Sequence, residues 1–177
     1  MQTLLIIDMQ NAWIDEHPRF QIGAITQKIN QLSERFRQLS LPVIFIQHQD
    51  TVVVPNTEPW QIHADFNQAK TDHYSSKTAC DSFADTHLKD LLDKLGSSSL
   101  TICGLATEFC VNTTMYASLS QGFDVTVIAD AHTTADRPHL TAEAIINHHN
   151  WVWTNMAVQK TQELRVLNCD TYLNELN

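Results

Sequence analysis

Residues 100–113 read Leu-Thr-Ile-Cys-Gly-Leu-Ala-Thr-Glu-Phe-Cys-Val-Asn-Thr, and they indicate a strand, a turn and a helix in succession. Its first half is an apolar run typical of a buried strand, Gly104 allows a tight turn, and the residues that follow suit a helix. The thiol of Cys110 then lies at a helix N-terminus, where unpaired N–H groups and the helix dipole favour the thiolate. We interpret Cys110 as a nucleophile; the alternative is a buried cysteine that packs under the sheet.

The same alternation of strand and helix continues along the chain. Strands are expected at 3–8, 43–47, 99–104, 124–129 and 151–154, and helices at 21–39, 84–95, 108–121, 138–149 and 168–175. Residues 50–82 lack sustained periodicity, so we interpret them as a functional excursion over the sheet. The pattern predicts a single domain over residues 1–177 with a three-layer α/β/α Rossmann-like fold and a mainly parallel sheet.

Four residues end or directly follow predicted strands: Asp8, His48, Gly104 and Asp130. Ligands of parallel sheets bind at the carboxyl ends of the strands, near the point where the strand order reverses. We therefore expect these four residues on the rim that carries the functional site.

Composition excludes several classes of partner and cofactor. The formal charge of −9, without a basic cluster, argues against nucleic acid. No apolar run approaches the roughly 20 residues that span a bilayer. The N-terminal residues resemble a core strand rather than a signal peptide, so we expect a cytoplasmic protein. The glycines form neither GxGxxG nor a Walker loop, which argues against NAD and ATP, and we expect no cofactor.

The four cysteines, Cys80, Cys103, Cys110 and Cys169, have no CxxC spacing, so a structural zinc site is not expected. In a cytoplasmic chain they stay reduced. Apart from Cys110, we interpret them as structural or incidental. Asp8 at the end of an apolar strand is either a functional carboxylate or a cap, and Lys77 alone would be an ordinary surface lysine.

Three segments together resemble a known family. They are Leu5-Ile-Ile-Asp-Met-Gln-Asn11, Lys77-Thr-Ala-Cys-Asp-Ser-Phe83 and Cys103-Gly-Leu-Ala-Thr-Glu-Phe-Cys-Val-Asn-Thr113. They resemble the signature of the isochorismatase-like cysteine hydrolases, a group that includes nicotinamidases, carbamoylsarcosine amidohydrolases and ureidoacrylate amidohydrolases. The resemblance continues through residues 122–131 and covers the chain from residue 3 to about 153.

The resemblance implies a catalytic triad and a reaction. Asp8 would be the general base, Lys77 the electrostatic partner, and Cys110 the nucleophile that forms a thioester with the substrate. A cis peptide bond at Leu105–Ala106 would direct the N–H groups of Ala106 and Cys110 at the developing oxyanion. The expected activity is hydrolysis of a C–N bond in a small amide, ureido or related compound, and the residues do not identify the substrate.

Departures from the family pattern limit the choice of activity. True isochorismatases lack the cysteine, so vinyl ether cleavage is not expected. Nicotinamidases carry a DxH metal motif, whereas this chain reads Gln47-His48-Gln49-Asp50 at that place. Zinc normally needs three or four convergent ligands, so we expect no bound metal and do not expect nicotinamide as the substrate.

Aromatic residues near these motifs are candidates for the substrate pocket. They are Trp13, Trp60 and Phe109, with His132 as a polar candidate. The alternative is that the aromatic residues belong to an ordinary core or interface. The family commonly forms dimers or tetramers, which implies a homo-oligomer. The competing hypothesis is a thiol redox sensor or a silent binding protein on the same fold, because an accessible acidic thiol oxidises readily.

Overall fold

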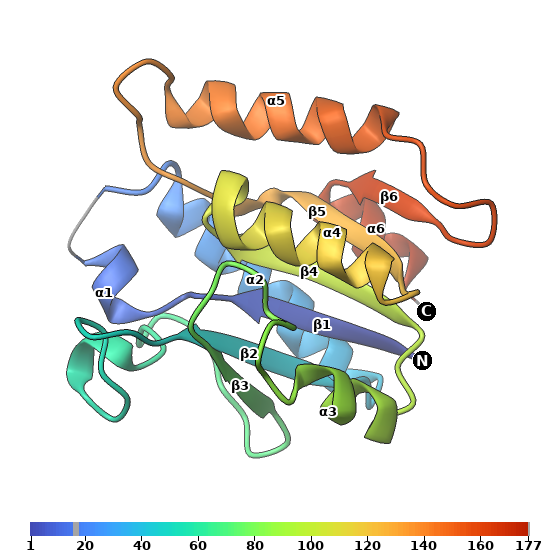
Figure 1. The fold of residues 1–177 in the computed structure, drawn as a ribbon, viewed down its shortest axis with the longest axis horizontal. Helices are drawn as coiled ribbons and strands as arrows, with labels where there is room; N and C mark the ends of the chain where they lie inside the picture. The colour runs from blue at the N-terminus through green and yellow to red at the C-terminus, as the bar shows by residue number, and fades with distance from the viewer. Residues whose placement is uncertain (16–17, 177) are drawn as a thin grey trace.

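The protein is described here by a computed structural model of residues 1–15 and 18–176. Six parallel strands form one sheet in the order β3-β2-β1-β4-β5-β6 (Figure 1). Their bounds are β1 Gln2–Ile7, β2 Val43–His48, β3 His73–Lys77, β4 Ser99–Leu105, β5 Asp124–Thr133 and β6 Leu164–Leu167. The strand order reverses between β1 and β4, so the carboxyl ends of these two strands flank the expected binding crevice.

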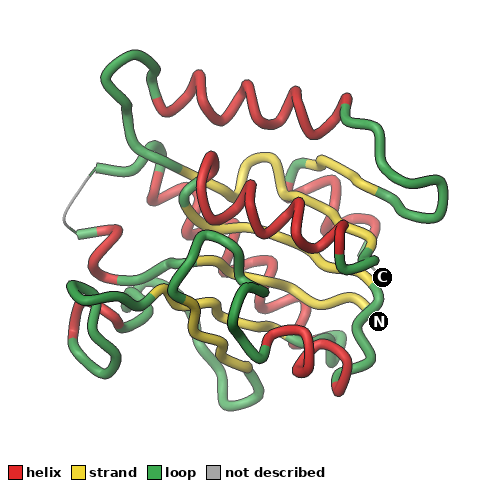
Figure 2. The backbone as a smooth tube through the Cα atoms, in the orientation of Figure 1, coloured by secondary structure: helices red, strands yellow, loops and turns green. Residues whose placement is uncertain are grey.

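Helices cover both faces of the sheet (Figure 2). The α-helices are α1 Asn11–Ile14, α2 Ile22–Gln38, α3 Leu88–Lys94, α4 Asn112–Ser120, α5 Ala142–Asn155 and α6 Cys169–Glu175. A 3₁₀-helix η1 spans Glu58–Trp60, and a π-helical turn η2 spans Thr107–Val111. The three-layer α/β fold predicted from the sequence is confirmed. Within the described residues, every helix is too short or too polar to cross a bilayer.

The central strand explains the two cores. Successive side chains of a strand point to opposite faces, and all of those in 4–7 are fully buried. Leu4 and Ile6 pack with α2 and α6, whereas Leu5 and Ile7 pack with α3 and α4. A strand buried on both faces needs a continuous apolar run, which is the pattern that made β1 predictable.

One expected strand is wrong, one helix begins later than expected, and two strands were not predicted. The strand expected at 151–154 is the last turn of α5, whose Trp153 is buried and donates through Nε1 to Asn112 at 2.9 Å. The helix expected from Pro138 begins only at Ala142, where Thr141 caps the N–H of Ala144 at 3.2 Å. The excursion over 50–82 contains an unpredicted strand, β3, and β6 was also unpredicted.

The position expected for Asp130 is wrong as well. The register between β4 and β5 shifts between Ile102 and Gly104, so four residues of β5 bulge out beside a single position of β4. Asp130 lies in this bulge, inside the strand rather than beyond its end, and pairs with Lys28 of α2. It belongs to a different cluster from Asp8 and does not line the cavity beside Cys110.

Candidate active site

Asp8 directly follows β1 and is almost completely buried, with 2% of its surface exposed. Its backbone turns at φ 53°, and its N–H donates to the carbonyl of Ile46 on β2 at 2.9 Å. One carboxylate oxygen, Oδ2, accepts from Lys77, while Oδ1 is buried without a partner. Buried polar atoms normally have partners, so Oδ1 is free to accept a proton or a hydrogen bond from a reacting group.

Lys77 is the last residue of β3 and is buried despite its charge. In the parallel register it lies opposite His48, the last residue of β2. Its Nζ donates to Asp8 Oδ2 at 2.7 Å, to the Ala79 carbonyl at 3.1 Å and to Cys110 Sγ at 3.1 Å. All three N–H donors of the ammonium group therefore have acceptors, and the group bridges a carboxylate and a sulfur that are 102 residues apart along the chain.

Cys110 lies in η2, immediately beyond the carboxyl end of β4. Gly104 permits this approach, because its φ is 116° and an added Cβ would lie 2.2 Å from the carbonyl oxygen of Ile7. The Leu105–Ala106 peptide bond is cis, as the resemblance implies. The carbonyl oxygen of Ala106 accepts hydrogen bonds from the N–H groups of Phe109 at 3.0 Å and Val111 at 3.2 Å. It accepts none from the N–H of Cys110, which lies between them in the sequence.

The electrostatics of this cluster correct one expectation. Burial and the neighbouring Asp8 carboxylate raise the pKa of the Cys110 thiol above its usual value, and Lys77 opposes this only in part. Burial and Asp8 therefore oppose the resting thiolate that the sequence predicts at a helix N-terminus. Burial also raises the pKa of Asp8, against the lowering effect of Lys77. The carboxylate and the thiol therefore compete for one proton.

The pKa of Lys77 is raised, although burial usually lowers the pKa of a lysine. Burial alone would lower it, but the charges of Asp8 and Cys110 and their hydrogen bonds raise it above its ordinary value. Lys77 is therefore a permanent cation at neutral pH, and one positive charge stabilises whichever partner carries the negative charge.

A cavity of about 290 Å³ opens beside the sulfur. Its lining residues come from the ends of β1, β2 and β4 and from the loops around them: Asp8, Trp13, Arg19, His48, Cys80, Leu105, Ala106, Phe109, Cys110 and Arg137. Among the described residues, five buried side-chain polar atoms lack hydrogen-bond partners, and three belong to lining residues: Asp8 Oδ1, Trp13 Nε1 and His48 Nδ1. A bound polar ligand would satisfy atoms that are otherwise costly to bury.

The sequence-based candidates for substrate binding divide into two groups. Trp13 and Phe109 line the cavity, and the Phe109 ring is 49% exposed. Trp60 lies in η1 and is not among the lining residues. Its carbonyl accepts from Gln10 Nε2 at 2.8 Å and from Gln47 Nε2 at 3.0 Å, so its backbone supports the ends of β1 and β2 instead.

His132 does not reach the cavity, which corrects the expectation placed on it. It is 1% exposed on β5, behind the turn that carries Cys110. Its ring nitrogens contact Thr107 Oγ1 at 2.9 Å and Asn150 Oδ1 at 3.0 Å. Burial lowers the pKa of His132 to about 4, so the ring is neutral at pH 7 and connects η2 to α5.

Sequence reasoning missed Arg19 and Arg137 as lining residues. Both lie in irregular segments next to a proline, where no periodic pattern indicates which way a side chain points. It also treated Cys80 as incidental, although Cys80 lines the cavity. Only the fold brings these three residues to Cys110, and no local signal in the sequence predicts it.

His48 Nε2 lies 3.5 Å from Asp50 Oδ2, the pair considered from the sequence. Across residues 1–15 and 18–176, no three His, Cys, Asp or Glu side chains come together as a metal site would require. A metal-free site stays a prediction.

Comparisons with known proteins agree with this geometry. The family model described as the isochorismatase domain matches residues 2–162. Streptothricin hydrolase of Streptomyces noursei is 32% identical over 142 residues, which cover 78% of this chain and 51% of that protein. A second streptothricin hydrolase of the same organism is covered over 56%, so the chain spans about half the length of these two relatives.

Solved structures match over nearly the whole chain. A crystal structure of an isochorismatase family protein has a TM-score of 0.84 and 32% identity, and the match covers 92% of this chain and 96% of that one. N-carbamoylsarcosine amidase from Thermoplasma acidophilum has a TM-score of 0.77 at 19% identity, with 96% of each chain covered, and this likeness concerns the fold alone.

Proposed function

Because the chain belongs to the isochorismatase family, we propose that it is a cysteine hydrolase that cleaves the C–N bond of a small amide or ureido compound. The names streptothricin hydrolase and N-carbamoylsarcosine amidase among similar proteins are consistent with this reaction class. The observation that carries the proposal is the contact of one buried ammonium group with both a carboxylate and a thiol beside a cavity.

The first step is activation of the thiol. Asp8 removes the proton from Cys110 Sγ, and the negative charge moves from the carboxylate to the sulfur while Lys77 stays in contact with both. Burial raises the pKa of both acids, and Lys77 opposes the rise in each, so the ammonium group stabilises the negative charge on either side of the proton transfer.

The sulfur then attacks the carbonyl carbon, and the electron pair of the C=O bond moves to its oxygen. The N–H groups of Ala106 and Cys110 face this oxygen in our proposal; among the described residues, neither donates to a backbone acceptor outside its own turn. Asp8 returns the proton to the departing nitrogen, the C–N bond breaks, and a thioester on Cys110 remains. Water, deprotonated by Asp8, hydrolyses the thioester to a carboxylic acid and restores the thiol.

The proposal is tested by ammonia or amine release from a panel of amides, ureas and ureido acids. We expect turnover of at least one compound, loss of that turnover in Cys110→Ala and Asp8→Asn, and an acyl adduct on Cys110 in mass spectra of rapidly acidified reactions. Circular dichroism of each variant is the control for folding. Normal turnover by either folded variant would exclude the mechanism.

The alternative of a thiol sensor is less consistent with the site. A sensor needs a thiolate at rest, whereas burial and Asp8 favour the neutral thiol of Cys110. Selective sulfenylation of Cys110 by mild peroxide, with no compound of the panel hydrolysed, would favour the sensor.

A further inference from the structure

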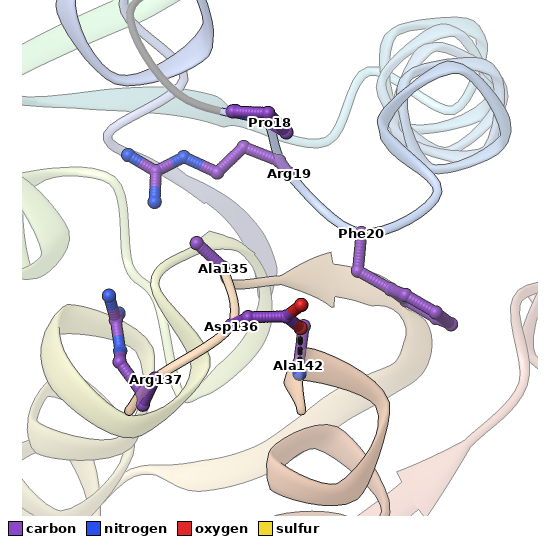
Figure 3. Close-up of a pocket in the computed structure, with 7 residues that line it drawn as sticks. All are labelled: Pro18, Arg19, Phe20, Ala135, Asp136, Arg137 and Ala142. Carbon is purple, nitrogen blue, oxygen red and sulfur yellow. Dashed lines mark hydrogen bonds between the residues drawn. The ribbon is translucent and has the colours of Figure 1, made fainter. Parts of the chain in front are cut away.

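Two arginines, Arg19 and Arg137, are shared by two neighbouring cavities. They line the cavity beside Cys110, and they also line a larger cavity of about 530 Å³ (Figure 3). The hydrolytic steps proposed above use neither residue. Positive side chains at the junction of two cavities therefore need an explanation of their own.

Arg19 is fixed to the wall of the smaller cavity. Its Nε donates to the carbonyl oxygen of Trp13, one of the lining aromatic residues. Burial, followed by repulsion from Arg137, lowers the pKa of Arg19 from the usual arginine value, while Glu108 acts in the opposite direction. The two guanidinium groups are thus close enough to repel each other.

Arg137 is fixed to the turn that carries the nucleophile. Its Nε donates to Glu108 Oε1 at 2.7 Å, and one of its terminal nitrogens donates to Thr134 Oγ1 at 3.0 Å. Its guanidinium carbon lies 5.2 Å from the centre of the Phe109 ring, within cation–π range. Glu108 and Phe109 directly precede Cys110, so the position of Arg137 is tied to that of the sulfur.

Among residues 1–15 and 18–176, the charges around Arg19 and Arg137 do not balance. Figure 3 shows the guanidinium groups of Arg19 and Arg137 reaching toward each other from opposite walls, while Asp136 turns away from them. The Asp136 carboxylate accepts from the N–H of Ala142 at the start of α5, at 2.8 Å. Among the described residues, Glu108 is the one carboxylate that forms an ion pair with either arginine, and its partner is Arg137.

We propose that the substrate carries a carboxylate, which Arg19 and Arg137 bind while its amide or ureido carbonyl lies beside Cys110. The planar guanidinium fork matches a carboxylate geometrically, and a partly buried cation pair gains most from an anionic ligand. The inference rests on the proposed function and narrows its substrate to carboxylated amides or ureas. The rest of such a substrate extends into the larger cavity.

The test compares two alkylating reagents that share one reactive carbon. Iodoacetate is an anion, and iodoacetamide is its neutral amide. With either reagent, the Cys110 Sγ–C bond forms, iodide leaves and the thiol proton passes to Asp8 and then to solvent. Rates are measured by mass spectrometry of the Cys110 peptide in a Cys80→Ser background, because Cys80 lines the same cavity.

Arg19 is replaced rather than Arg137, because Arg137 also holds Glu108. We expect Arg19→Gln to lower the ratio of the iodoacetate rate to the iodoacetamide rate by about tenfold, as for loss of one charge-assisted contact. Arg19→Lys should restore part of the ratio. The matched control, Arg165→Gln, removes a cation from β6 and should leave the ratio unchanged.

An unchanged ratio in Arg19→Gln would overturn the proposal. A second measurement compares carboxylated amides with their methyl esters. In the wild type we expect the free acids to have the higher kcat/KM, and in Arg19→Gln we expect this preference to disappear. Turnover of amides without preference for the acid would refute the carboxylate site and leave the hydrolase intact. A charge-dependent alkylation ratio without turnover of any amide would support the anion site and refute the hydrolase.

Discussion

Two clusters in the molecule are built from the same three residue types, an aspartate, a lysine and a cysteine. The β1 cluster consists of Asp8, Lys77 and Cys110, and the β5 cluster consists of Asp130, Lys28 and Cys169. In both, the aspartate and the lysine form an ion pair. In both, the aspartate lies on or directly after a strand of the same sheet.

The clusters differ in the burial of the ion pair and in the atoms that a ligand could contact. The β1 pair has side-chain exposures of 3% and 0%, and the β5 pair has 30% and 29%. In the β5 cluster both carboxylate oxygens are occupied, one by Lys28 and the other by the N–H of Cys169 at 2.8 Å. In the β1 cluster, Asp8 Oδ1 is unpaired, and the sulfur opens to a cavity.

The same three residue types therefore do not by themselves make a site that can accept a ligand. Desolvation of the ion pair, an unpaired oxygen and space beside the sulfur distinguish the β1 cluster, whereas the β5 cluster holds the start of α6 against α2. The following predictions compare matched substitutions in the two clusters.

Removing the sulfur should produce the largest difference. We expect Cys110→Ala to lower amide hydrolysis by a factor of at least about 10³, because no nucleophile remains to form the thioester. Cys169→Ala should keep its activity, measured as kcat/KM on the same amide. Loss of activity in a folded Cys169→Ala protein would contradict the assignment of separate roles.

Replacing the lysine should lower the free energy of unfolding by different amounts in the two clusters. Lys77→Met leaves a buried carboxylate without its partner and should lower the free energy of unfolding by about 3–5 kcal/mol. Lys28→Met breaks a partly exposed pair and should cost about 1 kcal/mol or less. Urea denaturation measures both. Equal losses would show that burial does not distinguish the two pairs.

The Lys77→Met effect should depend on pH, and the sign follows from Asp8. Burial already raises the pKa of Asp8, and loss of the cation removes the main opposing effect. The variant can then bury a protonated carboxyl at low pH but must bury an anion at high pH. We therefore expect a smaller loss of stability at pH 5 than at pH 8.

His132, which contacts η2 and α5, should make the stability of the protein depend on pH. Its pKa is lowered from 6.5 to about 4 by burial, so the unfolded chain binds a proton more readily between these values. Stability should fall by about 2 kcal/mol from this group when the pH drops from 8 to 5. His132→Gln should flatten that slope in urea denaturation, and an unchanged slope would place the acid sensitivity elsewhere.

The smallest effect is expected from Asp130→Ala. The substitution removes the acceptor for the N–H of Cys169 at the start of α6 and one partially exposed ion pair. We expect a loss of about 1 kcal/mol in thermal or urea unfolding and a kcat/KM within about twofold of the wild type. A large drop in kcat/KM would connect the β5 cluster to the chemistry.

The sequence could predict the elements that are buried on both faces. β1 and β4 are continuous apolar runs, and α2 shows helical spacing of its apolar residues, so desolvation dictates their structure directly. β3 is an edge strand with alternating exposure, and its polar sequence His-Tyr-Ser-Ser-Lys does not indicate a strand. β6, with the sequence Leu-Arg-Val-Leu, is the other edge strand; it is half-buried along its whole length, and its four residues are too few to show a strand pattern.

The site was predictable only in part. Asp8, Lys77 and Cys110 could be selected because their motifs resemble a family, and the structure brings these three side chains together. Their catalytic roles stay predictions. Arg19 and Arg137 could not be selected, because their position depends on how two irregular segments fold over the end of the sheet.

The placement of Lys77 on an edge strand has a consequence for assembly of the molecule. Among the described strands, β3 pairs with β2 alone, so a slip of one residue in that pairing would place Ser76 or Thr78 opposite His48 instead of Lys77. Such a chain would keep its core and helices but would lack the ammonium group that contacts Asp8 and Cys110. Phe45 and Tyr74 are partners in the observed register and stack with ring centres 5.8 Å apart, so this aromatic pair favours the register that brings Lys77 to Asp8 and Cys110.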